Sequence, residues 1–448
     1  AETWNLALRT ARHLGRGDTV AELLARYDQH PVGAVSRATH AHAQLARAEI
    51  AGDPEGVADV LNLHYPLPFD KQNLWPQAGY WLETGMEVAC WPHKFWNWDR
   101  KKPLYFGEFL HLQHYREADP YTVFLGDEAY PSFNQAMART KAMAWEMQIE
   151  AYRAAGVSGL CPWTLTETGD FPSDDNPRYL AVKRAYAPNA ALVRQYDSRF
   201  FAGEQVERTM MLYNDTLHAA KLLVRSQLAG NERPAVTTKA FDLPPAGMTQ
   251  FGLTLPMPAV AERTEAAWQV TVANGDQQVD QRNKTYWVFP RRKLSVPQGI
   301  RIALFETADH TLSQALGEAG VDVLRVADLG QLPDADVLLI GPHALDDVKP
   351  ETGTPTVGDR SGARQQIATF VHKGGNVIAL EQDSYECGLL PGRLVDRGAT
   401  ITFPRAKDDV LFAGLIEDDF WFWRGDHVVA RKTLFKPRQG RFRVLVDS

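Results

Sequence analysis

The pattern of apolar and polar residues changes twice along the 448-residue chain. Up to about residue 195, strand-like apolar runs alternate with longer stretches of helical periodicity. The pattern predicts helices at residues 5–27 and 133–155, and strands at residues 57–63, 103–109 and 157–165. Strands separated by helices at this spacing are typical of parallel pairing with helical crossovers.

The second part of the chain, from about residue 204 to 290, has no helical periodicity. Short stretches with strand character are separated by turn residues such as Asn214-Asp215 and Asn274-Gly275. The predicted strands are residues 206–214, 222–228, 248–255 and 268–273. This pattern predicts a small antiparallel β-sandwich.

From about residue 298 the pattern alternates again, with strands at 300–305, 321–326, 337–340 and 377–380. Helices at 311–319 and 364–372 lie between them, and glycines follow both helices, where a helix commonly ends. This order predicts a doubly wound α/β, flavodoxin-like domain. We therefore expect three domains: residues 1–197, 198–295 and 296–448, the last of them incomplete.

Composition narrows the possible functions. The net charge is −7 and no basic stripe is present, so nucleic acid is not an expected partner. No apolar run reaches the ~18 residues of a membrane-spanning helix, so no membrane partner is expected either. The three cysteines, Cys90, Cys161 and Cys387, are too far apart in sequence to indicate a zinc site or a disulfide framework. Eight of the 12 tryptophans precede residue 164, where they could form core or platforms for sugar rings.

Three consecutive predicted strands end in side chains that can bind or react. One ends at Glu108, directly after Gly107, and the preceding one ends at His64-Tyr65. The third ends at Trp163, with Glu167 four residues later. Each alone could be a surface glutamate, a packed histidine or a core tryptophan. Because catalytic groups of parallel barrels lie at the carboxyl ends of the strands, the three together favour an active site.

These motifs resemble glycoside hydrolases of clan A, particularly the family 2 β-galactosidase and β-glucuronidase group. The resemblance implies that Lys102-Pro-x-x-x-x-Glu108 is the seventh strand of a (β/α)₈ barrel, with Glu108 as nucleophile. It also implies that His64 and Tyr65 contact the sugar or the nucleophile and that Trp163, with Glu167, contributes to substrate binding. The expected activity is retaining cleavage of a β-linked sugar in an oligo- or polysaccharide, with no metal and no cofactor.

The chain departs from this family in one respect that concerns catalysis. The family carries its acid/base glutamate after an asparagine, and no Asn-Glu pair precedes Glu108 here. Glu2 lies 106 residues before Glu108 and is the candidate acid/base. The first four barrel strands are missing, so we expect a fragment that is insoluble or inactive alone, because open sheet edges are exposed. The alternative is a non-catalytic carbohydrate-binding or assembly protein on a degenerate barrel.

The α/β domain resembles class I glutamine amidotransferase-like domains that some β-galactosidases carry as accessory domains. Amidotransferase activity needs a cysteine on a sharp strand-to-helix turn, whereas the strand here leads to Glu381-Gln382, with Cys387 five residues later. We expect an assembly role, with homo-oligomers formed through this domain. The acidic and aromatic residues 418–427 favour an interface over a sugar-binding rim. A periplasmic or extracellular location is favoured.

Overall fold

A computed structural model describes most of the chain after residue 59. The described residues are 60–67, 88–91, 93–96, 98–109, 121–131, 133–162, 175–230, 234–291, 296–308, 310–346, 361–383, 393–395, 398–435 and 442–447, with Glu22, Ala25 and Leu82. They fall into two compact units. Unit 1 holds the described residues up to Ser198, Gln205–Pro256 and Glu265–Tyr286; unit 2 holds Arg199–Glu204, Met257–Thr264 and the described residues from Trp287. No helix in these ranges is long and apolar enough to cross a membrane.

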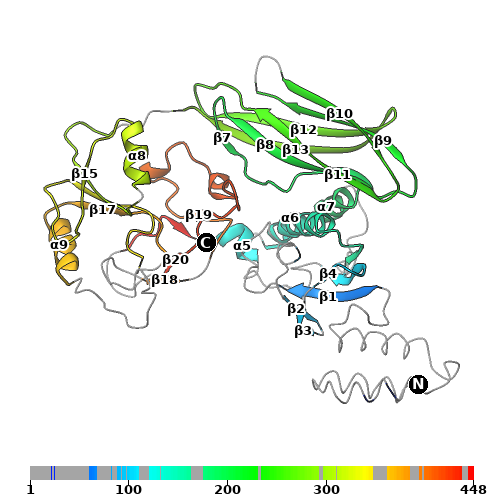
Figure 1. Cartoon of the computed structure of the whole chain (residues 1–448), viewed down its shortest axis with the longest axis horizontal. Coiled ribbons are helices and arrows are strands. Elements are labelled where there is room, and N and C mark those ends of the chain that lie inside the picture. Colours follow the sequence, from blue (N-terminus) through cyan, green and yellow to red (C-terminus); the bar gives the residue numbers. More distant parts are fainter. Residues whose placement is uncertain are drawn as a thin grey trace. The chain divides into compact units, whose positions relative to one another are not determined.

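The first sheet of unit 1 has the strand order β3-β2-β1-β4-β5 (Figure 1). Its strands are β1 (Leu61–Leu67), β2 (Val88–Trp91), β3 (His93–Trp96), β4 (Leu104–Phe109) and β5 (Gly159–Pro162). β4 is parallel to both β1 and β5, as the alternating sequence pattern predicts. β2 and β3 add an antiparallel edge that the sequence pattern did not predict. Three parallel strands fit part of a barrel; an eight-stranded barrel stays a prediction.

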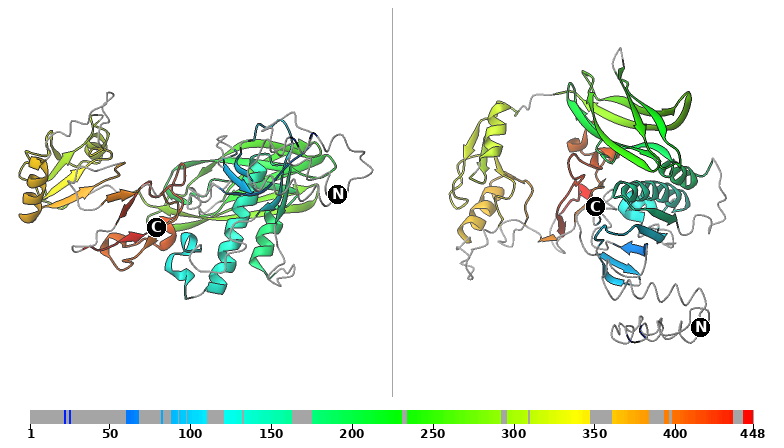
Figure 2. Two further views of the ribbon diagram at one scale, coloured as in Figure 1. Left: turned by 90° about the horizontal axis from the view of Figure 1, so that it is seen from below. Right: turned by 45° about the vertical axis from the view of Figure 1, so that its right-hand side comes forward.

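Helices cover this sheet from one side. They are α5 (Thr122–Leu125), the 3₁₀ turn η4 (Gly126–Ala129), α6 (Phe133–Ala154) and α7 (Pro177–Ala185). α6 matches the predicted helix at 133–155, and Gly156 follows it with φ +80°, a conformation that suits glycine. Figure 1 and the right-hand view of Figure 2 show α6 and α7 between β1 and β4 on one side and the remaining strands of unit 1 on the other.

The remaining strands of unit 1 form two antiparallel sheets, ordered β10-β9-β12-β13 and β11-β8-β6. Their bounds are β6 (Asn189–Leu192), β8 (Gln205–Asn214), β9 (Ala220–Leu228), β10 (Ala235–Leu243), β11 (Gly247–Pro256), β12 (Thr264–Asn274) and β13 (Gln277–Phe289). Along β8, β9 and β12 buried and exposed residues largely alternate, so one face of each strand is covered. This agrees with the predicted sandwich pattern, although the fold class itself stays a prediction.

Unit 2 contains a parallel four-stranded sheet with the order β15-β14-β16-β17. Its strands and helices are β14 (Ile302–Phe305), α8 (Thr311–Glu318), β15 (Val323–Arg325), β16 (Val337–Ile340), α9 (Ser361–His372) and β17 (Asn376–Ala379). Its core is built from Ala303, Val326, Leu329, Leu338, Ile340, Leu345 and Ile367. All four strands and both helices coincide with predicted ones to within about three residues at each end. The doubly wound class stays a prediction.

The other elements of unit 2 are short. They are β7 (Arg199–Phe201), β18 (Arg393–Val395), β19 (Phe403–Pro404), η5 (Val410–Phe412), η6 (Glu417–Phe420), β20 (Thr433–Phe435) and β21 (Val446–Asp447). β7 pairs with the last residues of β13, which also belong to unit 2. Within the acidic segment 418–427, the Asp419 carboxylate is buried and paired with Arg199 (3.1 Å) and Arg263 (2.9 Å). This carboxylate stabilises unit 2 internally; an interface at the neighbouring aromatic residues stays a prediction.

Candidate active site

The candidate site lies at the carboxyl ends of β4 and β5 and beside the middle of β1, to which β4 is parallel. The strand register places His64 beside Glu108 and Phe109 beside Pro162. Since the strands run in the same direction, His64, Glu108 and Pro162 lie side by side across the sheet. β1 begins and ends four residues later than the predicted strand 57–63, so His64 lies within the strand and not after it, and it pairs directly with Glu108.

A bulge at Gly107 sets the direction of the Glu108 side chain. Phe106 pairs with Leu63 and Glu108 with His64, so Gly107 is the extra residue on β4. Phe106 and Phe109 both pack edge-on against Tyr152 of α6, at ring distances of 4.6 and 5.7 Å. In a regular strand residues three apart would face opposite sides. The bulge therefore keeps both phenylalanines in the core and turns Glu108 away from the helix, a common use of bulges at sites.

Gly107 also allows β1 side chains to lie directly over the backbone of β4. A Cβ atom at this position would be 2.6 Å from both Asn62 Oδ1 and His64 Nε2. Contacts that short do not occur for real Cβ atoms, so any other residue would push these two side chains away. Asn62 and His64 are two residues apart on β1 and so share one face of the strand. Glycine at 107 thus allows Asn62 and His64 to keep these positions.

His64 and Glu108 form the polar pair of the site. His64 Nδ1 lies 3.5 Å from Glu108 Oε2, and both side chains are about one-quarter exposed, at 26% and 28%. The distance is longer than a good hydrogen bond and within reach of one after a small movement on substrate binding. A partly covered carboxylate beside an imidazole can act as a nucleophile, because the histidine can donate a hydrogen bond to one oxygen and orient the other toward a substrate.

The turn that leads into β4 is fixed by side-chain to backbone hydrogen bonds. Trp98 Nε1 donates to the carbonyl of Lys102 at 3.0 Å. Arg100 stacks over the Trp98 ring and donates to the carbonyls of Leu82 and Ala155, at 2.7 and 3.0 Å. Lys102, the first residue of the motif that ends at Glu108, is thus held through its backbone carbonyl two residues before β4 begins.

Several predicted site residues cannot be placed. Glu2, Trp163 and Glu167 lie outside the described residues, and Tyr65 lies in β1 with a side chain that is not described. Their assigned roles stay predictions. The structure adds Asn62, which the sequence reasoning missed. Its position two residues before His64 in a predicted strand was the available signal.

The described residues of unit 1 also line a cavity of about 380 Å³ between α6 and the sheet containing β13. Arg282 on β13 pairs with Glu150 (2.9 Å) and Asp280 (3.1 Å), and Tyr196 donates to Glu150 at 3.1 Å. Burial raises the pKa of Glu150, while burial lowers the pKa of Lys284 to about 8. Lys284 Nζ donates to the carbonyls of Val193 and Gln195. These charged groups are paired with one another or with backbone carbonyls. Their pairing stabilises unit 1, so we assign no function to the cavity.

Comparison with known proteins leaves the family open. The sequence matches no protein-family model and no curated protein. A β-D-mannosidase from Dictyoglomus thermophilum is similar over 38% of this chain and 21% of its own length, with 16% identity and a TM-score of 0.27. A β-glucosidase from Listeria innocua is similar over 23% of this chain and 16% of its own length, with 15% identity and a TM-score of 0.18. A superoxide reductase from Ignicoccus hospitalis is similar over 24% of this chain and 86% of its own length, with 11% identity and a TM-score of 0.20. Parts of the chain thus show low similarity to glycosidases and to an unrelated protein alike, and the functional argument rests on the site.

Proposed function

We propose that the chain is the nucleophile-bearing part of a retaining glycoside hydrolase acting on a β-linked sugar, of the β-galactosidase kind. The observation that supports this most directly is the position of Glu108. Its carboxylate stands at the carboxyl end of a buried parallel strand, beside His64 and turned out of the core by the bulge at Gly107. Catalytic carboxylates of parallel barrels occupy this position.

In the proposed reaction a carboxylate oxygen of Glu108 attacks the anomeric carbon. The bond from that carbon to the leaving-group oxygen breaks as a second carboxylic acid protonates that oxygen. The resulting glycosyl ester of Glu108 is then cleaved by water, whose proton the second carboxylate accepts, and the sugar is released with its original configuration. Retaining enzymes need this second group about 5–5.5 Å from the nucleophile. Glu2 is proposed for the role from the sequence alone. Tyr65, Trp163 and Glu167 are proposed to bind the sugar.

The experiment tests Glu108 directly in the whole protein. Glu108→Gln is expected to keep the fold and abolish hydrolysis of aryl β-glycosides, since an amide cannot form the glycosyl ester. An activated 2-fluoro-sugar is expected to label Glu108 in the wild type, as read by peptide mass spectrometry. The matched control is Glu128→Gln, an exposed glutamate paired with Arg139, which should retain full activity.

Two results would count against the proposal. Covalent labelling of another carboxylate would assign the nucleophile elsewhere. A folded wild-type protein that binds oligosaccharides but neither hydrolyses them nor becomes labelled would favour the non-catalytic carbohydrate-binding alternative.

A further inference from the structure

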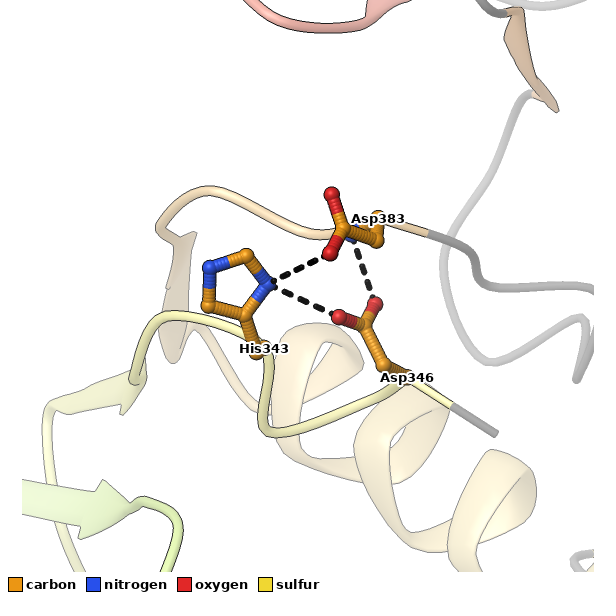
Figure 3. A group of neighbouring side chains, drawn as sticks. All are labelled: His343, Asp346 and Asp383. Carbon is orange, nitrogen blue, oxygen red and sulfur yellow. Dashed lines mark hydrogen bonds and ion pairs between the residues drawn. The ribbon is translucent and has the colours of Figure 1, made fainter. Parts of the chain in front are cut away.

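A second cluster of reactive side chains lies in unit 2, far in sequence from Glu108. It consists of His343, which follows β16, Asp346 three residues later, and Asp383, which follows β17. His343 Nδ1 is 2.8 Å from Asp346 Oδ2 and 3.3 Å from Asp383 Oδ2. Figure 3 shows both carboxylates turned toward this one nitrogen. In open parallel sheets, the carboxyl ends of the strands are where ligands bind.

The spacing of these three atoms suits a metal ion. Ligands about 2.1 Å from one metal lie about 3.0 Å apart at a right angle and about 3.4 Å apart at the tetrahedral angle. Of the two nitrogen–oxygen distances, 3.3 Å lies within this range and 2.8 Å lies slightly below it. All three ligand atoms lie within 4.8 Å of one another. Two ligands about 2.1 Å from one ion are at most about 4.2 Å apart, so side-chain shifts of up to about 0.6 Å bring all three atoms within reach of one ion.

The loops that carry the cluster are held together by a buried glutamine. Gln382 is 5% exposed, and its Oε1 accepts from the backbone N–H of Leu345 at 2.8 Å. Its Nε2 donates to the carbonyls of Gly341 and Leu380, both at 2.9 Å. One buried side chain thus joins the loop after β16 to the loop after β17. This arrangement fixes the backbone beneath the cluster independently of the contacts among the three side chains.

A second contact orients one of the carboxylates. The backbone N–H of Asp383 donates to Asp346 Oδ1 at 2.7 Å, which leaves Asp346 Oδ2 directed at His343. Ligating carboxylates in metal sites are commonly hydrogen-bonded through the second oxygen in this way. Arg431, whose charge also acts on Asp383, pairs with Asp426 (2.8 Å) and Glu381 (3.4 Å). Two aspartates therefore converge on one imidazole, and a divalent cation would balance their charge.

We propose that His343, Asp346 and Asp383 bind a divalent transition-metal ion, with Zn²⁺ as the expected occupant. One imidazole nitrogen and two carboxylate oxygens form a mixed donor set that Zn²⁺ binds, whereas Mg²⁺ and Ca²⁺ prefer oxygen ligands alone. His343 and Asp383 are exposed, at 44% and 58%, so water can complete the coordination. The ion would join the loop after β16 to the loop after β17.

The test is Zn²⁺ titration of the whole protein by calorimetry near neutral pH. The wild type is expected to bind one more Zn²⁺ ion than His343→Ala or Asp383→Asn. Asp383→Asn changes an exposed carboxylate to an amide of the same shape, so it should keep the fold. Gln382→Leu is expected to weaken binding about 10–100-fold, the usual effect of losing support behind the ligands.

The matched control is His310→Ala. His310 is also an exposed histidine beside a carboxylate, Glu306 at 3.1 Å, but no second carboxylate is grouped with it among the described residues. This variant should bind as many Zn²⁺ ions as the wild type. Zn²⁺ should also raise the unfolding temperature of the wild type more than that of Asp383→Asn, because a ligand that binds only the folded state stabilises it. Equal stoichiometry and equal thermal shifts in the wild type, His343→Ala and Asp383→Asn would overturn the proposal.

Discussion

At the scale of single residues, Gly107 controls the geometry around Glu108. Gly107→Ala would place a methyl group 2.6 Å from Asn62 Oδ1 and from His64 Nε2, so both side chains must move. A displacement of about 1 Å at a site can cost roughly 100-fold in rate. We expect kcat/KM for an aryl β-glycoside to fall by about that factor, with the circular dichroism spectrum unchanged. The control is Gly252→Ala, where a Cβ meets nothing within 4 Å; equal losses in both variants would refute the argument.

Sequence reasoning identified Glu108 because the motif places a carboxylate directly after a buried strand. It could not give the direction of that side chain. Simple alternation puts residues 104, 106 and 108 on one face, which would send Glu108 toward the helix together with Leu104 and Phe106. The bulge depends on the register of β4 with both of its neighbours, and such long-range pairing is not encoded in the local pattern. Asn62 was missed although the local pattern carried the signal, because it lies two residues before His64 and so shares its face of the strand.

At the scale of elements, Arg282 joins strand β13 to helix α6. It pairs with Glu150 and Asp280, whose side chains are only 8% and 5% exposed, and donates to the carbonyl of Arg184 at 2.6 Å. Arg282→Met leaves these buried carboxylates without their cation, which costs about 3–5 kcal/mol. We expect the urea midpoint of unit 1 to fall accordingly. Arg225→Met, on the exposed face of β9, is the control and should change it little.

Lys284 on the same strand predicts a pH dependence of stability. Its folded-state pKa is lowered to about 8 from 10.5, chiefly by burial, so between these values the unfolded chain binds a proton that the folded chain does not. Burial of Lys284 therefore lowers the free energy of unfolding by its full amount below pH 8. This cost disappears as the pH increases from about 8 to 10.5, so stability rises over that interval. Compared with Lys284→Met, the wild-type urea midpoint should increase over this interval. A constant difference between the two proteins would contradict the assigned burial.

The elements that sequence reasoning found and missed differ in burial. β8, β9 and β12 alternate buried with exposed positions, and the apolar pattern located all three. Eight of the nine residues of β10 are at least partly exposed, and β13 carries the charged Arg282 and Lys284 on its partly covered side. Neither has a clean apolar face. Strands stabilised by their neighbours and by ion pairs leave little trace in the apolar pattern.

At the scale of the whole molecule, the pairing of the strands follows the three parts of the apolar pattern: largely parallel in the first, antiparallel in the second and parallel in the third. The two compact units are not continuous along the chain. Residues 199–204 and 257–264 belong to unit 2 although they flank strands of unit 1. Arg199 and Arg263, one from each segment, both bind Asp419 near the C-terminal end. A pairing over more than 150 residues cannot be read from local periodicity, so the boundaries at 197/198 and 295/296 stay predictions.

These two buried ion-pair centres allow the units to be tested separately. Arg282, Glu150 and Asp280 lie in unit 1, whereas Arg199, Arg263 and Asp419 lie in unit 2. We expect scanning calorimetry of the whole protein to show two unfolding transitions. Removing one member of a buried pair costs about 3–5 kcal/mol, which lowers the midpoint of a unit of this size by about 6–20 °C. Arg282→Met should therefore lower one transition and Asp419→Ala the other, because the latter leaves two guanidinium groups close together without their carboxylate. If both substitutions lower the same transition by similar amounts, the two units unfold as one.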